Sequence, residues 1–332
     1  MKRIALVLVC VLLAGGVVFA DSDTTKAGVI KLKCGIMVSK DYSQAKAAKY
    51  FAEEIAKETD GRVVIDVFTD GVLGSEPEMW EAINAGALDM AVVSPAYIGN
   101  FVPEYQLYDL PFLFKSRAHR DAVVDGPIGA QLDKLLEKKG NMVVLGQFGG
   151  TGRIMISRNK KIETIDDLKG LKMRVYASPV VVSTWKALGT LPVTVAYAEA
   201  YTALQTGVID AAENETSTLI TQRWYEPCKY ISMTEHNINT RPFLIGAKQF
   251  AKLPPDIQAI FRKVGKDAAQ YAVKVEREDD ARYIEQLKSF GLQILELKDK
   301  DKWIAATRDL RMNFVKKYNL EQTLKDIETT AQ

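Results

Sequence analysis

The chain has 332 residues, more than one hydrophobic core usually supports, which favours two domains. Hydrophobic residues make up 47% and charged residues 26%, a composition that argues against a disordered or fibrous protein. The balance of 44 basic and 42 acidic residues, without a dense basic cluster, argues against a nucleic-acid partner.

The first twenty residues have the layout of a secretory signal peptide. Lys2 and Arg3 form a short positive region, residues 4–13 form an apolar run, and residues 18–20 make a small-x-small cleavage pattern. We therefore expect export and cleavage after Ala20. The mature chain would then carry equal numbers of basic and acidic residues.

Strand and helix signals alternate through two cycles, separated by a glycine-rich turn at residues 149–152. Apolar or β-branched runs predict strands, and amphipathic stretches ended by glycine predict helices. The predicted strands are residues 30–37, 63–68, 88–93, 153–157, 171–175, 193–195 and 208–212. The predicted helical segments are residues 43–59, 76–85, 164–168, 180–188 and 199–206. Near-continuous apolar strands are typical of parallel sheets covered on both faces, so the fold class is α/β.

Two segments of the two cycles match, residues 80–91 and residues 201–212. The matched positions are Ala82 with Ala203, Gly86 with Gly207, and Asp89 with Asp210. The match reflects either the common pattern of a helix-to-strand turn or two similar lobes that face each other. In the second case the strand ends at 93–94 and 213–214 point into one cleft, because open α/β sheets bind ligands outside the carboxyl ends of their strands.

Residues 255–290 predict one long helix, which at about 1.5 Å per residue exceeds the width of one lobe. It would span both domains; the alternative is two helices broken near Gly265. Cys34 and Cys228 would form a disulfide between distant parts of an exported chain, and the alternative is two buried free thiols.

Motifs for catalysis and metal binding are absent. No HExxH, CxxC, GxSxG or P-loop pattern occurs, and there are two histidines, His119 and His236. His119 lies in a charged stretch, and we expect it in solvent. We expect no cofactor and no metal. An exported α/β enzyme is the rival hypothesis, but acidic pairs such as Glu213 and Glu215 lack a partner, and alternation at a strand end explains them more simply.

Two arginines stand near predicted strand ends. Arg174 lies among apolar neighbours, and arginine is seldom buried without a partner. Its planar fork binds a carboxylate through two parallel hydrogen bonds, so it could hold an anionic ligand or a neighbouring acidic side chain. Arg153, after the glycine turn, leaves the same alternatives open, with a surface charge favoured.

Several motifs together resemble a known family. Residues 166–175, 187–189, 201–210 and 213–214 closely resemble the DctP-type solute-binding proteins of tripartite ATP-independent periplasmic (TRAP) transporters. Further matches are residues 73–74, 88–94, 100–104, 109–114, 125–127, 225–226 and 229–230. The matches follow the family's order over essentially the whole mature chain.

The resemblance implies a periplasmic binding protein without catalysis. Its fold would be two α/β lobes with a ligand cleft between them, hinge strands and a long domain-spanning helix. Lobe I would comprise residues 28–150 and 240–279, and lobe II residues 151–239 and 280–332. The implied ligand is a small organic acid, and the implied partners are the small and large membrane subunits of a TRAP permease. A different transporter or a sensor would share the fold.

The resemblance also assigns roles within the cleft. Arg174 matches the arginine that forms a salt bridge with the ligand carboxylate, Arg153 looks like a second cleft arginine, and Asn214 matches an asparagine that hydrogen-bonds the ligand. By position, further cleft residues are Tyr197, Glu76 and Ser94.

Two departures from the family pattern bear on the ligand. Glu215 and Tyr176 each stand where proline is common. A carboxylate and a phenol suit hydroxyl groups better than a second carboxylate, so with Glu213 and Tyr176 among the ligand contacts we expect a sugar acid. A hexuronate or aldonate is favoured over a C4-dicarboxylate or keto acid. Arg241, in a hinge-like segment, could bind a second carboxylate and reverse this preference.

Overall fold

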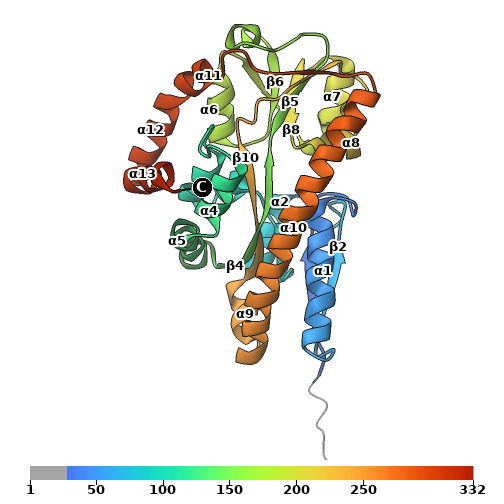
Figure 1. Cartoon of the computed structure of the whole chain (residues 1–332). Helices are drawn as coiled ribbons and strands as arrows, with labels where there is room; N and C mark the ends of the chain where they lie inside the picture. Colours follow the sequence, from blue (N-terminus) through green and yellow to red (C-terminus); the bar gives the residue numbers. More distant parts are fainter. Residues whose placement is uncertain (1–27, 332) are drawn as a thin grey trace, which may run out of the picture.

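The structure, a computed structural model, describes residues 28–331, and the predicted signal peptide lies outside the described residues. Two α/β lobes follow one another along the molecule, and one long helix runs beside both (Figure 1). We name the lobes after their sheets. The first lobe holds a five-stranded sheet and the second a six-stranded sheet.

The sheet of the first lobe has the order β2-β1-β3-β10-β4. Its strands are β1 (Ile30–Gly35), β2 (Val63–Phe68), β3 (Met90–Val92), β4 (Met142–Gly152) and β10 (Ile238–Gly246). Helices cover both faces of this sheet. Phe51 and Ile55 of α1 (Ser43–Glu58) belong to one hydrophobic cluster, and Trp80 and Ile83 of α2 (Glu76–Ala85) belong to another.

The sheet of the second lobe has the order β11-β9-β5-β8-β6-β7. Its strands are β5 (Ile154–Ser157), β6 (Lys172–Val175), β7 (Leu191–Thr194), β8 (Ala211–Asn214), β9 (Tyr230–Ser232) and β11 (Gln293–Leu295). Its helices are α6 (Pro179–Ala187), α7 (Ala200–Thr206) and α8 (Thr216–Thr221), with single turns η3 (Ile165–Leu168) and η4 (Tyr197–Glu199).

The two sheets repeat one arrangement. In the first sheet, β1 lies between β2 and β3 and is parallel to both, and β10 pairs antiparallel with β3. In the second sheet, β6 takes the place of β1, β7 that of β2, β8 that of β3 and β5 that of β10. The matched residues are equivalent too: Gly86 and Gly207 are left-handed helix caps at φ 79° and 80°. The carboxylates of Asp89 and Asp210 accept hydrogen bonds from the backbone N–H of Lys33 and Lys172, respectively. The sequence match therefore reflects two similar lobes.

Two strand connections join the lobes. β4 and β10 pair antiparallel along their length, from Met142 opposite Gly246 to Gly152 opposite Ile238. β4 continues into β5 of the other sheet after a single residue, Arg153, and the return crossing from β9 to β10 takes residues 233–237. These crossings are the hinge strands that the family resemblance implies.

The helix α10 (Pro255–Ser289) is continuous and contacts α1 and β4 in the first lobe and α8 in the second. Its 35 residues span about 52 Å at 1.5 Å per residue. Gly265 does not break it. A Cβ on Gly265 would come within 2.4 Å of the Leu145 carbonyl oxygen, and one on Gly146 within 2.5 Å of the Gly265 carbonyl oxygen. Glycine at both positions lets helix and strand touch.

The remaining elements are helices and turns that the sequence patterns did not predict. They are α3 (Pro95–Ile98), η1 (Pro103–Asp109), α4 (Arg117–Val124), α5 (Pro127–Leu135), η2 (Leu136–Gly140), α9 (Ala247–Lys252), α11 (Lys300–Ala306), α12 (Arg308–Tyr318) and α13 (Glu321–Thr329). The last helices contact both lobes: α12 lies against α6 and η1, and α13 against α5. The assignment of residues 280–332 to lobe II stays a prediction.

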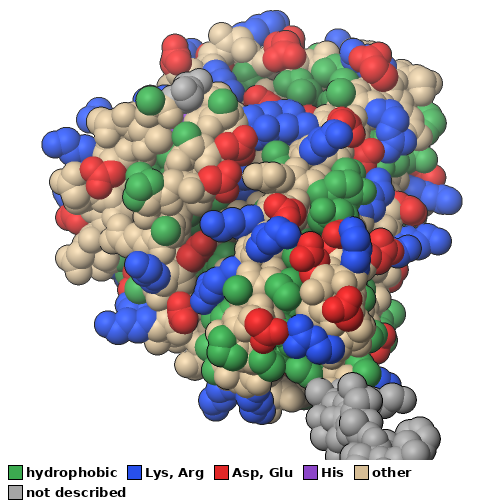
Figure 2. All heavy atoms as spheres, turned by 60° about the horizontal axis from the view of Figure 1, so that its bottom comes forward, with side chains coloured by type: hydrophobic (Ala, Val, Ile, Leu, Met, Phe, Trp, Pro, Cys, Tyr) green, Lys and Arg blue, Asp and Glu red, His purple; other side chains and the backbone are tan. Residues whose placement is uncertain are grey.

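The expectation that His119 is in solvent was wrong. It is fully buried, and its Nε2 lies 2.8 Å from the carbonyl oxygen of Ile327 in α13, because the C-terminal helices fold back over α4. Cys34 and Cys228 are both buried free thiols. Across residues 28–331, no helix has the length and apolar character to cross a membrane. Acidic and basic side chains are interspersed over the face shown in Figure 2.

Candidate functional site

A cavity of about 310 Å³ lies between the two lobes and is lined by both. Sites for small molecules commonly measure roughly 300 to 1,000 Å³. It brings together eight of the nine predicted site residues: Glu76, Ser94, Arg153, Arg174, Tyr176, Tyr197, Asn214 and Arg241. Its position matches the rule for open α/β sheets, because Ser94 follows β3, Arg174 lies in β6 and Asn214 ends β8.

Glu213 is the predicted residue that does not line this cavity. It lines a space of about 10 Å³ behind it, together with Arg153, Tyr176 and Asp109. Such a space holds about one water molecule. Glu213 is therefore placed to support Arg153 from behind, and its predicted contact with the ligand is not part of this arrangement.

Arg174 is a buried cation without an acidic partner. Its side chain is 2% exposed, and its Nε donates to the carbonyl oxygen of Val195 at 3.0 Å. Its guanidinium lies 5.5 Å from the ring centre of Tyr176 and 5.8 Å from that of Trp224. Among the described residues it forms no ion pair with a carboxylate, and burial lowers its pKa. The salt-bridge alternative for Arg174 is therefore excluded within residues 28–331.

Arg153 is held by the protein itself. Its Nε donates to Glu213 Oε2 at 2.5 Å, and one terminal nitrogen donates to Glu215 Oε1 at 2.9 Å. The expectation of a surface charge was wrong, because Arg153 is 4% exposed at the crossing from β4 to β5. Burial opposes the ionisation of Glu213, but Arg153 and His236 lower its pKa to about 2.

Glu215 joins several side chains in the cavity wall. Its Oε1 accepts hydrogen bonds from Arg153, from Asn239 Nδ2 at 2.8 Å and from Arg241 at 2.8 Å. Its Oε2 accepts from the hydroxyl of Tyr42 at 3.1 Å, which is a contact across the lobes. Although burial raises the pKa of Glu215, the two arginines bring it below its usual range.

Glu76 contributes a carboxyl group of a different kind. It is the first residue of α2, where Ser75 and Glu78 form a capping box, and its Oε2 accepts from the Ser94 backbone N–H at 2.5 Å. Burial raises its pKa, against the lowering effects of Arg241 and Ser94. A carboxyl group can accept hydrogen bonds from ligand hydroxyls.

Sequence patterns missed part of the lining. Tyr42, Gln44, Tyr97 and Thr218 also line the cavity, and so does Glu215, which the sequence had singled out only as a departure from the family pattern. Tyr42 and Gln44 follow β1, so the rule about carboxyl ends would have found them if applied to the first strand as well. Thr218 and Tyr97 lie in short helices after β8 and β3, where the sequence carries no distinctive pattern.

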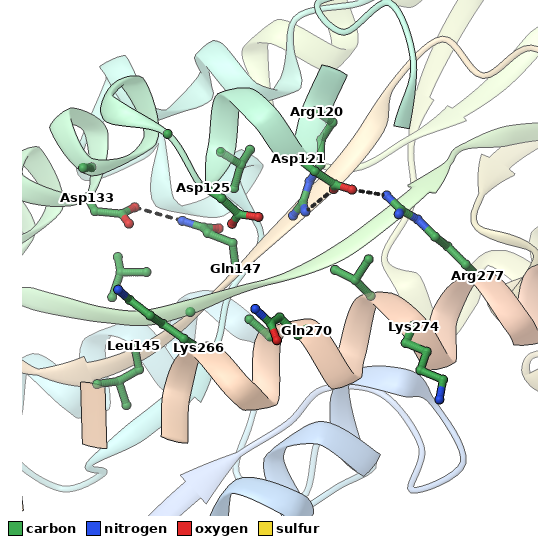
Figure 3. Close-up of a pocket in the computed structure, with 17 residues that line it drawn as sticks. Arg120, Asp121, Asp125, Asp133, Leu145, Gln147, Lys266, Gln270, Lys274 and Arg277 are labelled. Atoms are coloured by element: carbon green, nitrogen blue, oxygen red, sulfur yellow. Dashed lines mark hydrogen bonds and ion pairs between the residues drawn. The ribbon is translucent and has the colours of Figure 1, made fainter. Parts of the chain in front are cut away.

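A larger cavity of about 560 Å³ lies elsewhere, between α10, β4 and the α4–α5 segment (Figure 3). Its charges are largely paired: Asp121 binds Arg277 at 2.7 Å and Arg120 at 3.1 Å, and Asp133 accepts from Gln147 at 2.9 Å. None of the predicted site residues lines it. The cavity between the lobes is therefore the better candidate. Within residues 28–331, no cluster of three His, Cys, Asp or Glu side chains could hold a metal.

Comparisons with known proteins show the family to which the chain is similar. Residues 34–317 match the family model DctP, "Bacterial extracellular solute-binding protein, family 7". The C4-dicarboxylate-binding periplasmic protein DctP of Rhodobacter capsulatus is 31% identical over 264 residues, covering 79% of this chain and 78% of that protein.

Two solved structures are also similar. A TRAP periplasmic solute-binding protein of Chromohalobacter salexigens with bound D-glucuronate superposes with a TM-score of 0.87 at 30% identity, covering 90% of this chain and 100% of that one. One from Polaromonas sp. bound to D-erythronate has a TM-score of 0.86 at 29% identity, covering 91% and 99%. With its two repeated lobes and the cavity between them, the chain belongs to the DctP family of solute-binding proteins of TRAP transporters, and it is a binding protein rather than an enzyme.

Proposed function

We propose that the protein captures a sugar acid with a single carboxylate, a hexuronate or an aldonate, in the cavity between the lobes, with Arg174 holding the carboxylate. The observation that carries this proposal is the difference between the three cavity arginines. Arg153 and Arg241 are paired with Glu213 and Glu215, whereas Arg174 has no acidic partner among the described residues. A ligand carboxylate that binds Arg174 through two hydrogen bonds would offset the cost of burying the guanidinium charge.

The other cavity groups supply hydrogen bonds for hydroxyl groups. Ser94, Tyr97, Tyr197, Asn214 and Thr218 are uncharged and can donate or accept. Glucuronate and erythronate, which are bound to the two similar structures, each carry one carboxylate and several hydroxyls. A C4-dicarboxylate, the ligand named for the Rhodobacter relative, is the rival. Pairing of Arg241 with Glu215 disfavours it.

Capture would proceed by closure of the lobes, divided as residues 28–150 with 240–279 and residues 151–239 with 280–332. The crossings at Arg153 and at residues 233–237 would serve as hinges. In the proposed cycle the chain is exported and cleaved after Ala20. The loaded protein then delivers its ligand to the small and large membrane subunits of a TRAP permease. Amino-terminal sequencing of the exported protein, expected to begin at Asp21, checks the cleavage step.

Isothermal titration of the mature protein tests the ligand and the anchor. We expect D-glucuronate, D-gluconate or D-erythronate to bind more tightly than succinate or pyruvate. Arg174→Ala should weaken that binding by about 2–5 kcal/mol, roughly 30- to 4,000-fold, because it leaves a ligand carboxylate desolvated and unpaired. Arg62→Ala, which removes an exposed arginine paired with Asp256, is the control and should bind normally. Normal binding by a folded Arg174→Ala variant would place the anchor elsewhere.

A further inference from the structure

Glu215, one of the two glutamates that line the cavity, makes its contacts with the protein's own cations and hydrogen-bond donors. Arg153 and Arg241 reach its Oε1 at 2.9 and 2.8 Å, and Asn239 and Tyr42 complete its contacts. Glu215 is 2% exposed, so these contacts are shielded from bulk water. A buried ion pair in such surroundings is costly to break, because one charge would be left unpaired.

This pairing sets the charge that the cavity offers to a ligand. Three guanidinium groups line it, and Glu213 and Glu215 compensate two of them. Arg174 remains as the one guanidinium of the wall that forms no ion pair with a carboxylate among the described residues. One ligand carboxylate balances it. A second carboxylate would have to displace Glu215 from Arg241 or lie beside Glu76 and Glu215 without a cation of its own.

We infer that Glu215 is the residue that selects monoacids, because it occupies Arg241 and withholds that cation from a second ligand carboxylate. This inference rests on the proposed function and names the chemical feature of the ligand that the site rejects. It also gives Arg241 a role: the arginine is a latent second anion site, closed by an internal carboxylate. A second ligand carboxylate would meet an arginine that is already paired and a carboxylate of like charge, and this is a repulsive element of specificity.

Matched pairs of ligands isolate this feature. D-erythronate and meso-tartrate share a four-carbon chain and its stereochemistry, and differ by a terminal CH₂OH in place of a carboxylate. D-gluconate and D-glucarate form the equivalent six-carbon pair. For the wild-type protein we expect the monoacid of each pair to bind at least about tenfold more tightly.

Glu215→Gln is the decisive variant, because it keeps the shape and an acceptor oxygen and removes the charge that neutralises Arg241. We expect the ratio of dissociation constants within each pair to shift toward the diacid by at least about tenfold. Glu276→Gln is the matched control. Glu276 is buried and accepts from the same Asn239 at 3.1 Å, but it does not line the cavity, and its variant should keep the wild-type ratio.

The outcomes separate this inference from the proposed function. If the wild-type protein binds no sugar monoacid, the proposed function fails. If it does, and a folded Glu215→Gln variant keeps the wild-type ratio, the role of Glu215 alone is wrong. An equal shift in Glu276→Gln would also overturn it, by showing a general effect of charge. Should Glu215→Gln fail to fold, Glu215→Asp decides: its shorter carboxylate cannot hold both arginines, so the ratio must move in the same direction.

Discussion

Single residues in this protein have shifted pKa values because burial and close partners act against each other. Arg174 is buried without a carboxylate partner, and burial lowers its pKa. Arg153 is equally buried, but Glu213 and Glu215 raise its pKa by more than burial lowers it. The difference lies in the partners, since both side chains are nearly inaccessible. A ligand carboxylate at Arg174 would therefore supply what Arg153 already obtains from the protein.

Asp133 gives a prediction on pH. Burial raises its pKa to about 7, although hydrogen bonds from Gln147 and Tyr105 oppose the rise. Figure 3 shows the hydrogen bond between Gln147 and Asp133. In the unfolded chain it titrates near 4, so between pH 4 and 7 the folded state binds more protons and this group's contribution to stability falls as pH rises. Asp133→Asn removes that decline.

We therefore expect the melting temperature of Asp133→Asn, relative to wild type, to be higher at pH 8 than at pH 5. Thermal unfolding at both pH values measures this difference. Asp66→Asn, an exposed substitution on β2, should show no such trend. A difference that stays constant with pH would mean that Asp133 is ionised in the folded protein at both values.

At the scale of elements, the contact between α10 and β4 depends on two glycines. Gly265 and Gly146 face each other so closely that a Cβ on either would meet backbone atoms at 2.4 to 2.5 Å. In an open helix, replacing glycine by alanine stabilises by about 1 kcal/mol. Here the same replacement must push the helix away from the strand.

Gly265→Ala should accordingly destabilise the protein by about 1–3 kcal/mol, the usual cost of overpacking, despite the better helix propensity of alanine. Urea unfolding gives the value. Lys266→Ala, at the next and exposed position, should change stability by less than about 0.5 kcal/mol. A stabilised Gly265→Ala variant would contradict the close packing.

At the scale of the whole molecule, the two lobes are joined by side chains as well as by hinge strands. Asp280 of α10 accepts hydrogen bonds from Arg117 of α4 at 2.7 Å and from Thr216 of α8 at 2.8 Å, so one carboxylate ties an element of each lobe. Arg117 also reaches Glu235, in the crossing from β9 to β10, at 3.0 Å. None of these four residues lines the ligand cavity.

Arg117→Ala should weaken binding of the sugar acid by roughly two- to tenfold, equivalent to about 0.5–1.4 kcal/mol, because it loosens the arrangement in which both lobes meet around the cavity. Titration calorimetry measures the affinity, and thermal unfolding reports stability in parallel. A lower melting temperature with unchanged affinity would assign the ion pair to stability alone.

Much of this protein followed from sequence patterns because they are local or have a fixed period. The α/β class, most strands, the long helix and the repeated Gly–Asp turns depend on hydrophobic periodicity and on glycine caps, which neighbouring residues encode. Arg174 could be found because an arginine inside an apolar strand is rare. Elements between residues 95 and 140 went unpredicted, because these helices are shorter than the stretches of sequence over which a helical period can be recognised.

Only the tertiary structure decided which charges are paired. Tyr42, Glu215 and the pair Asn239 and Arg241 of β10 lie in three separate segments, and their hydrogen bonds arise from the way two lobes meet. His119 likewise lies in a charged stretch but is buried, because α13, some 200 residues later, returns to cover it. Side-chain burial and ion pairing are properties of contacts between distant segments. Sequence therefore determined the two-lobed α/β fold and pointed to Arg174, while folding decided which cations of the cavity are paired with carboxylates.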